Sequence, residues 1–157
     1  HTIRYNPVRV SSDEFSYPIH VYIRYEIEKV IFAEKIKFQD IKELWNSMYK
    51  EYLDIKLSND SEGVLQDIHW YEGIFGYFPT YVLGAMISSQ IKYNHPKYDE
   101  FLKNPEGKNI KSIADWLNEN IHQKASLYSS DEMLQSISGE KLNSTYYSKH
   151  LRERFIK

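Results

Sequence analysis

The sequence has no cysteine among its 157 residues, only six glycines and five prolines, and no long apolar run. The absence of cysteine excludes disulfide scaffolds and thiolate metal sites, and it fits a cytoplasmic protein. A membrane-spanning helix needs about 20 apolar residues, whereas the apolar stretches here are only a few residues long. No segment has the pattern of a signal peptide. We therefore expect a cytoplasmic location and no membrane partner.

The sequence also has no large excess of charge of either sign. Lysine and arginine together number 20, aspartate and glutamate 22, and the formal net charge is -2. Lysine and arginine do not gather into a block, which a nucleic-acid-binding surface would need. These numbers argue against a nucleic-acid partner.

The sequence does have helical periodicity and many aromatic residues. Apolar spacing predicts an all-α fold in a single helical unit over residues 1–157. Tyrosine is unusually frequent, with 14 copies, and it suits polar clefts because it combines an apolar ring with a hydroxyl group. A loop rich in glycine and aromatic residues is expected between the second and third helices. The predicted helices cover residues 13–35, 39–54, 80–93, 110–123, 130–138 and 144–155.

The common catalytic and metal-binding motifs are missing. No two histidines lie four residues apart, so the His-Glu-x-x-His zinc motif is absent. There is no Gly-x-Ser-x-Gly elbow and no phosphate-binding loop. The residues of this chain therefore predict no zinc site.

Two features carry charge in a suggestive pattern. His20, Arg24 and Glu28 are spaced four residues apart and share one helix face; spacing alone favours a solvated row of ion pairs. Arg9 precedes that helix in a short β-branched segment, where a guanidinium fork suits a carboxylate. An ordinary surface arginine fits the same pattern equally well.

Residues 63–70 (GVLQDIHW) concentrate an amide, a carboxylate, an imidazole and an indole. Such a cluster is either a structural corner, in which these groups satisfy one another, or part of a binding site. The chemistry of these residues leaves both interpretations open.

Read in order, these segments resemble the thermostable (Taq-type) zinc metallocarboxypeptidases. Residues 8–13 (VRVSSD) are similar to the Ile-Arg-x-x-Ala-Asp motif of that family, with Ser12 in place of its alanine. Residues 63–70 match the family's Gly-x-x-Gln-Asp-x-His-Trp motif at every fixed position. The neighbouring segments also resemble the family, namely residues 20–28, 73–81, 116–122 and 139–143.

The resemblance implies a C-terminal portion of such an enzyme. The family's zinc ligands lie upstream of the arginine motif and are not in this sequence. The fold implied is a helical domain that forms one wall of a gluzincin-like peptidase groove. The activity implied is zinc-dependent removal of C-terminal amino acids from peptides, with zinc bound by the full-length parent. We expect this chain alone to bind no zinc and to be inactive.

The resemblance also implies roles for individual residues. Arg9 would bind the terminal carboxylate of the peptide substrate, which has a free C-terminus. His69 and Tyr77 would be the catalytic residues, donating hydrogen bonds to the oxyanion. The remaining substrate-side candidates are Gln66, Asp67, Trp70, Arg24 and Tyr81.

Two other interpretations remain. One is a non-catalytic all-α peptide-binding or interaction module. The other is a structural helical domain whose tyrosines line an oligomer interface. If part of the fold is missing, its apolar surfaces are exposed, and we expect homodimers or self-association.

Overall fold

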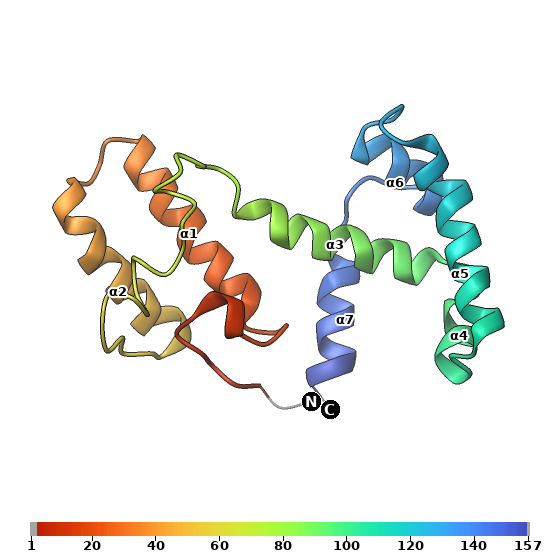
Figure 1. Cartoon of the computed structure of the whole chain (residues 1–157), viewed down its shortest axis with the longest axis horizontal. Coiled ribbons are helices and arrows are strands. Elements are labelled where there is room, and N and C mark those ends of the chain that lie inside the picture. Colours follow the sequence, from red (N-terminus) through yellow and green to blue (C-terminus); the bar gives the residue numbers. More distant parts are fainter. Residues whose placement is uncertain (1–2, 157) are drawn as a thin grey trace. The chain divides into compact units, whose positions relative to one another are not determined.

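The computed structural model describes residues 3–156, and this part of the chain contains helices and no strand (Figure 1). The predicted all-α fold is therefore confirmed. The helices are α1 (Tyr17–Phe32), α2 (Ile41–Leu53), α3 (Pro79–Asn94), α4 (Tyr98–Lys103), α5 (Gly107–Asn120), α6 (Ser130–Ser138) and α7 (Thr145–Phe155), with 3-10 turns at Arg9–Ser11, Phe38–Asp40 and His122–Lys124.

Two compact units make up the chain. The first unit comprises His1–Leu83 and Leu151–Lys157, and the second comprises Gly84–His150. The helices α3 and α7 each contribute residues to both units. The sequence predicts one helical unit because no linker composition separates the two parts.

The core of the first unit lies between α1 and α2, which pack side by side (Figure 1). Ile23 and Ile27 from α1 are fully buried against Trp45 and Tyr49 from α2. Trp45 and Tyr49 stack with their ring centroids 5.3 Å apart. The apolar spacing that predicted these two helices is therefore also the spacing of their buried faces.

The start of α1 differs from the prediction. The helix begins at Tyr17, four residues later than predicted, with Pro18 in its first turn. The carboxylate of Asp13 accepts hydrogen bonds from the backbone N–H groups of Phe15 and Ser16, at 2.9 and 2.8 Å. This local turn competes with helix formation, and the fixed φ of proline is compatible only with a helix start.

The second unit contains one helix that the sequence did not predict. The six-residue helix α4 lies between two proline turns and is too short to show helical periodicity. Helix α6 was predicted with its bounds, because Ser129 and Glu132 form a capping box and Gly139 ends the helix at φ 77°.

A long irregular segment, residues 54–78, connects α2 to α3. It returns over α1, because its residues bond to Arg9, Arg24 and Glu28. This segment contains residues 63–70 and is called the 54–78 loop below.

Candidate functional site

Asp67 is the centre of the site, and two arginines hold its carboxylate. Arg9 donates to Oδ1 of Asp67 through Nε at 3.0 Å and Nη2 at 2.7 Å. Arg24 contacts Oδ2 through Nε at 2.6 Å and Nη2 at 2.5 Å. The chain thus brings together the arginine motif, helix α1 and the 54–78 loop at one carboxylate.

The ion-pair triad is buried. Arg9 is 6 % exposed and Arg24 is 0 % exposed. Burial alone would raise the pKa of Asp67, but the guanidinium groups of Arg24 and Arg9 hold that pKa below its ordinary value. Asp67 is therefore a carboxylate at neutral pH.

Gln66 ties the N-terminal segment to the loop. Its Oε1 accepts from the backbone N–H of Arg9 at 2.8 Å, and its Nε2 donates to the carbonyl of Pro7 at 3.1 Å. The same Nε2 group lies 2.6 Å from the carbonyl of Glu62 and 3.2 Å from the hydroxyl of Tyr49. Gln66 and Asp67 together fix where Arg9 lies.

The row formed by His20, Arg24 and Glu28 is buried, so its interpretation as a solvated row of ion pairs is wrong. All three side chains are at most 4 % exposed. They face Tyr49 and the 54–78 loop: His20 Nδ1 is 3.0 Å from the hydroxyl of Tyr49, and Glu28 bonds to loop residues. The spacing identified the shared face but could not show that a distant loop covers it.

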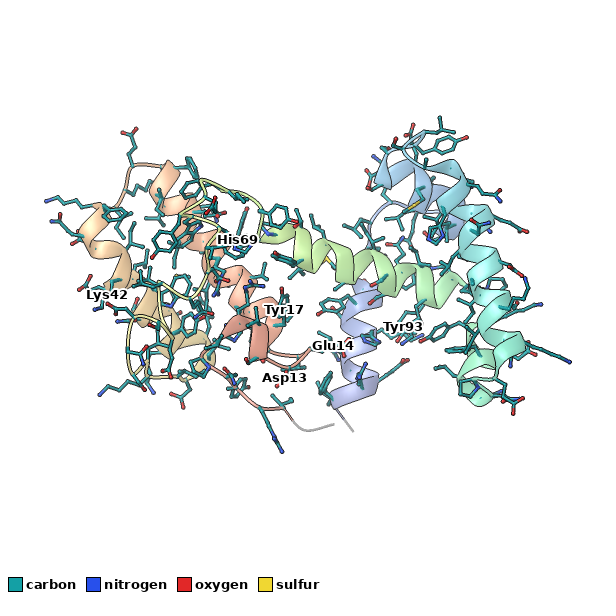
Figure 2. The ribbon with its side chains drawn as sticks, in the orientation of Figure 1. Asp13, Glu14, Tyr17, Lys42, His69 and Tyr93 are labelled. Carbon is teal, nitrogen blue, oxygen red and sulfur yellow. The ribbon has the colours of Figure 1, made fainter. Side chains whose placement is uncertain are left out.

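His69 lies on the loop beside the start of α3 (Figure 2). Its Nε2 is 3.0 Å from the hydroxyl of Tyr81, and its ring lies 5.7 Å from that of Tyr77 and 4.4 Å from that of Phe78. Nδ1 of His69 is buried and has no hydrogen-bond partner in the described part of the chain.

This geometry favours one tautomer of His69. A buried N–H without an acceptor is less common than a buried lone pair without a donor. The proton therefore belongs on Nε2, which then donates to the oxygen of Tyr81. Tyr81 keeps its own O–H free to donate elsewhere, and Tyr77, which is 46 % exposed, presents a second hydroxyl nearby.

Aromatic rings surround the guanidinium group of Arg9. Its Cζ lies 5.8, 5.6 and 5.1 Å from the ring centres of Tyr17, Phe78 and Tyr81. The hydroxyl of Tyr17, which lies at the start of α1 (Figure 2), accepts from Nη1 of Arg9 at 2.8 Å. A guanidinium group has five N–H bonds. The hydrogen bonds within the described residues use three of them.

Glu28 bonds both to Trp70 and to the backbone of the loop at Gly76. Oε1 of Glu28 accepts from Nε1 of Trp70 at 2.8 Å, and Oε2 accepts from the backbone N–H of Gly76 at 3.1 Å. The indole of Trp70 lies edge-on to Trp45, with their centroids 5.8 Å apart.

Sequence reasoning missed two contributors, Tyr17 and Tyr49. The hydroxyl of Tyr49 meets Nη1 of Arg24 at 3.3 Å as well as His20 and Gln66, although its spacing marked it only as a core residue. His20 was identified from the sequence as part of a polar row, but it was not among the predicted site residues.

Burial of His20 predicts acid sensitivity between pH 6.5 and 4. Burial, and then the charges of Arg24 and Arg9, lower its pKa from 6.5 to about 4. The unfolded chain therefore binds a proton in this window that the folded chain does not, so stability falls as pH falls. The difference corresponds to about 3 kcal/mol of unfolding free energy.

Urea unfolding at pH 7 and pH 4.5 measures this effect. The variant His20→Gln is the control, because the pKa of His95 is also lowered by burial and adds to the slope of the native chain. The native chain should lose more stability than the variant over the same pH interval. Equal losses would contradict the assignment to His20.

Residues 3–156 contain no group of three or more histidine, aspartate or glutamate side chains that could hold a metal ion. In the same residues, no helix is long and apolar enough to cross a membrane. The described residues therefore do not fit a metal centre of their own.

Comparison with known proteins identifies one family. Residues 1–155 match the family described as carboxypeptidase Taq (M32) metallopeptidase. Carboxypeptidase 1 of Bacillus subtilis is 40 % identical over 152 residues, which cover 94 % of this chain and 30 % of that protein. Thermostable carboxypeptidase 1 of Pyrococcus furiosus is 34 % identical over 158 residues, covering 98 % and 31 %.

Solved structures similar to this chain are also carboxypeptidases. The structure of metallocarboxypeptidase 1 from Trypanosoma cruzi is 38 % identical, with a TM-score of 0.91 over 99 % of this chain and 32 % of that one. The structure of the Pyrococcus furiosus carboxypeptidase gives a TM-score of 0.89 at 35 % identity, over 98 % and 31 %. The chain thus spans about a third of the length of the relatives it matches.

Proposed function

The chain belongs to the carboxypeptidase Taq (M32) metallopeptidase family, and from this premise we propose that it is the C-terminal part of a zinc metallocarboxypeptidase. The family match over residues 1–155 carries the proposal. Contacts between segments that are distant in sequence support it, because Arg9 bonds to Asp67, 58 residues away, and Arg9 and His69 both contact Tyr81. The proposed reaction is removal of C-terminal amino acids from peptides, with this chain forming one wall of the groove and inactive by itself.

Zinc is proposed for the larger protein only. The described residues of this chain do not form a metal-binding group, so the ligands would come from the part of the relatives that this chain does not cover. The steps proposed below concern only the residues of this chain.

Arg9 is proposed to bind the terminal carboxylate of the substrate. Asp67 and Tyr17 hold three of its N–H bonds, which fixes the plane of the guanidinium group. One N–H on Nη1 and one on Nη2 remain for a carboxylate. Only a peptide with a free C-terminus offers that charge, and this would restrict the enzyme to chain ends.

The His69–Tyr81 pair and Tyr77 are proposed to stabilise the oxyanion that forms at the scissile carbonyl. With the proton of His69 on Nε2, Tyr81 accepts from His69 and can donate its own O–H outward. Tyr77 lies beside Tyr81, with their ring centroids 5.4 Å apart, so the two hydroxyls come from one short segment. His69 then acts through Tyr81 or, by exchanging that partner, directly on the substrate.

The other candidates are proposed to shape the substrate side of the groove. Gln66 and Asp67 fix Arg9, and Trp70 braces the loop next to His69. Arg24 is fully buried, so its contribution is to hold Asp67 in place.

A chimera tests the proposal. Residues 1–157 replace the matching third of the Bacillus subtilis carboxypeptidase 1, and the chimera is assayed with a peptide carrying a free C-terminus and with its C-terminal amide. We expect metal-dependent cleavage of the free peptide and none of the amide. A chimera that folds and binds metal but cleaves neither peptide would contradict the proposal and favour a non-catalytic peptide-binding module.

Self-association of the isolated chain is a further expected result. Phe32, Ile68 and Tyr71 in the first unit are 65 to 69 % exposed, and Phe32 contacts Phe75, which is also exposed. Apolar surface of this kind favours association. Sedimentation should show mass rising with concentration, and less so for Ile68→Lys combined with Tyr71→Lys. A clean monomer of the native chain at all concentrations would contradict this.

A further inference from the structure

Glu28 is a buried carboxylate that the proposed chemistry leaves without a role. It lies on α1 one turn beyond Arg24, and it is 4 % exposed. Its carboxylate accepts from two neutral N–H groups: the indole of Trp70 and the backbone of Gly76. A buried carboxylate is costly unless its oxygens accept strong hydrogen bonds, and each oxygen here accepts one.

The two hydrogen-bond partners of Glu28 are sequence neighbours of the proposed catalytic residues His69 and Tyr77. Trp70 directly follows His69, and Gly76 directly precedes Tyr77. Between them the loop makes tight turns, in which the backbone N–H of Ile74 donates to the carbonyl of His69 at 2.8 Å. One carboxylate therefore joins the two ends of the segment that separates His69 from Tyr77.

The backbone at Gly76 is adapted to this contact. Gly76 has φ 73°, a left-handed conformation that residues with side chains rarely adopt. This conformation is part of the turn that presents its N–H to Oε2 of Glu28. The indole of Trp70 is held in turn between Trp45 and Phe78, both of which are buried.

We propose that Glu28 is a positioning residue that sets the spacing between His69 and Tyr77 by bonding to Trp70 and Gly76 at the same time. This inference deepens the proposed function and rests on it for its catalytic consequence. The carboxylate itself does not touch substrate. Both of its oxygens must be acceptors, so an amide cannot replace the carboxylate.

The variant Glu28→Gln tests this with almost no change of shape. The amide has one acceptor oxygen, so its NH₂ group must face either the indole N–H or the Gly76 N–H, and one bond is lost. The matched control is Glu26→Gln on the same helix, because Glu26 pairs with the exposed Lys29 instead of the loop.

Hydrogen exchange on the chain of residues 1–157 is the first readout, and it does not depend on activity. In Glu28→Gln we expect exchange at the Gly76 amide or the Trp70 indole to be faster by at least about tenfold, with the α2 amides unchanged. Unchanged exchange at both positions overturns the proposal. An equal acceleration throughout the first unit also overturns it, because that is the result of general destabilisation.

Kinetics of the chimera are the second readout. For Glu28→Gln we expect kcat to fall by at least about tenfold with KM changed by less than about threefold, since oxyanion contacts act in the transition state. Glu26→Gln should behave as the unmodified chimera does. Unchanged kcat in Glu28→Gln overturns the positioning role. If the unmodified chimera is inactive, the proposed function fails, while hydrogen exchange still decides whether Glu28 fixes the loop.

Discussion

Replacing Asp67 by alanine should strongly destabilise the first unit. The substitution leaves the guanidinium groups of Arg9 and Arg24 buried without their shared carboxylate. Removing one partner of a buried ion pair typically costs about 3–5 kcal/mol, because the remaining charge is uncompensated. In this triad two charges would be left, and they would repel each other.

Urea unfolding measures this effect most directly in a Trp116→Phe background. Trp116 belongs to the second unit, so the remaining tryptophan fluorescence reports on Trp45 and Trp70 in the first unit. The variant Asp67→Asn keeps the shape and part of the hydrogen bonding, and should lose less stability than Asp67→Ala. It provides a folded protein if the alanine variant does not fold.

Asp60→Ala is the matched control. Asp60 lies in the same loop and pairs with Lys42, and both side chains are about half exposed. Lys42 is labelled in Figure 2. Exposed ion pairs contribute little because water and salt screen them. We expect little change in the unfolding midpoint. If Asp67→Ala were as mild as Asp60→Ala, the buried charges of Arg9 and Arg24 would not depend on Asp67 for compensation.

Removing the proposed oxyanion donors should give the largest effect on catalysis. In the chimera, His69→Ala and Tyr81→Phe are each expected to lower kcat by about 10²–10³-fold, the usual loss when one such donor is removed. Because His69 and Tyr81 form one hydrogen-bonded pair, the double variant should lose little more than either single variant.

Tyr71→Phe serves as the control for the tyrosine substitution. Tyr71 lies in the same loop as His69 and is 65 % exposed, and no role at the site is proposed for it. Steady-state kinetics should show its kcat unchanged. Near-normal kcat/KM in His69→Ala would remove His69 from the catalytic proposal, and additive losses in the double variant would show that His69 and Tyr81 act separately.

Local sequence patterns predicted those parts of the fold that depend on neighbouring residues. Helix α6 was predicted with its bounds because its cap and its terminating glycine directly flank it in the sequence. Helix α1 was predicted but its start was not, because the side chain of Asp13 forms a turn that competes with the helix. Helix α4 was missed because six residues between two turns are too few to show a period.

In the candidate site too, the local sequence motif was predictable and the contacts between distant segments were not. Residues 63–70 matched a family motif from sequence alone, and this indicated Gln66, Asp67 and His69 as a group. The partners of that group could not be predicted, since Arg9 and Arg24 are 58 and 43 residues from Asp67 along the chain.

The sequence by itself determined the helical class, the family resemblance and the residues worth testing, because periodicity, capping and motifs are properties of short segments. Only the tertiary structure decided that the row of His20, Arg24 and Glu28 is buried. The physical reason is that burial depends on what covers a helix face, and the covering group in this protein is the 54–78 loop, which follows α2 in the sequence and bonds back to α1. Because that loop covers the row, His20, Arg24 and Glu28 are buried and support the site instead of facing solvent.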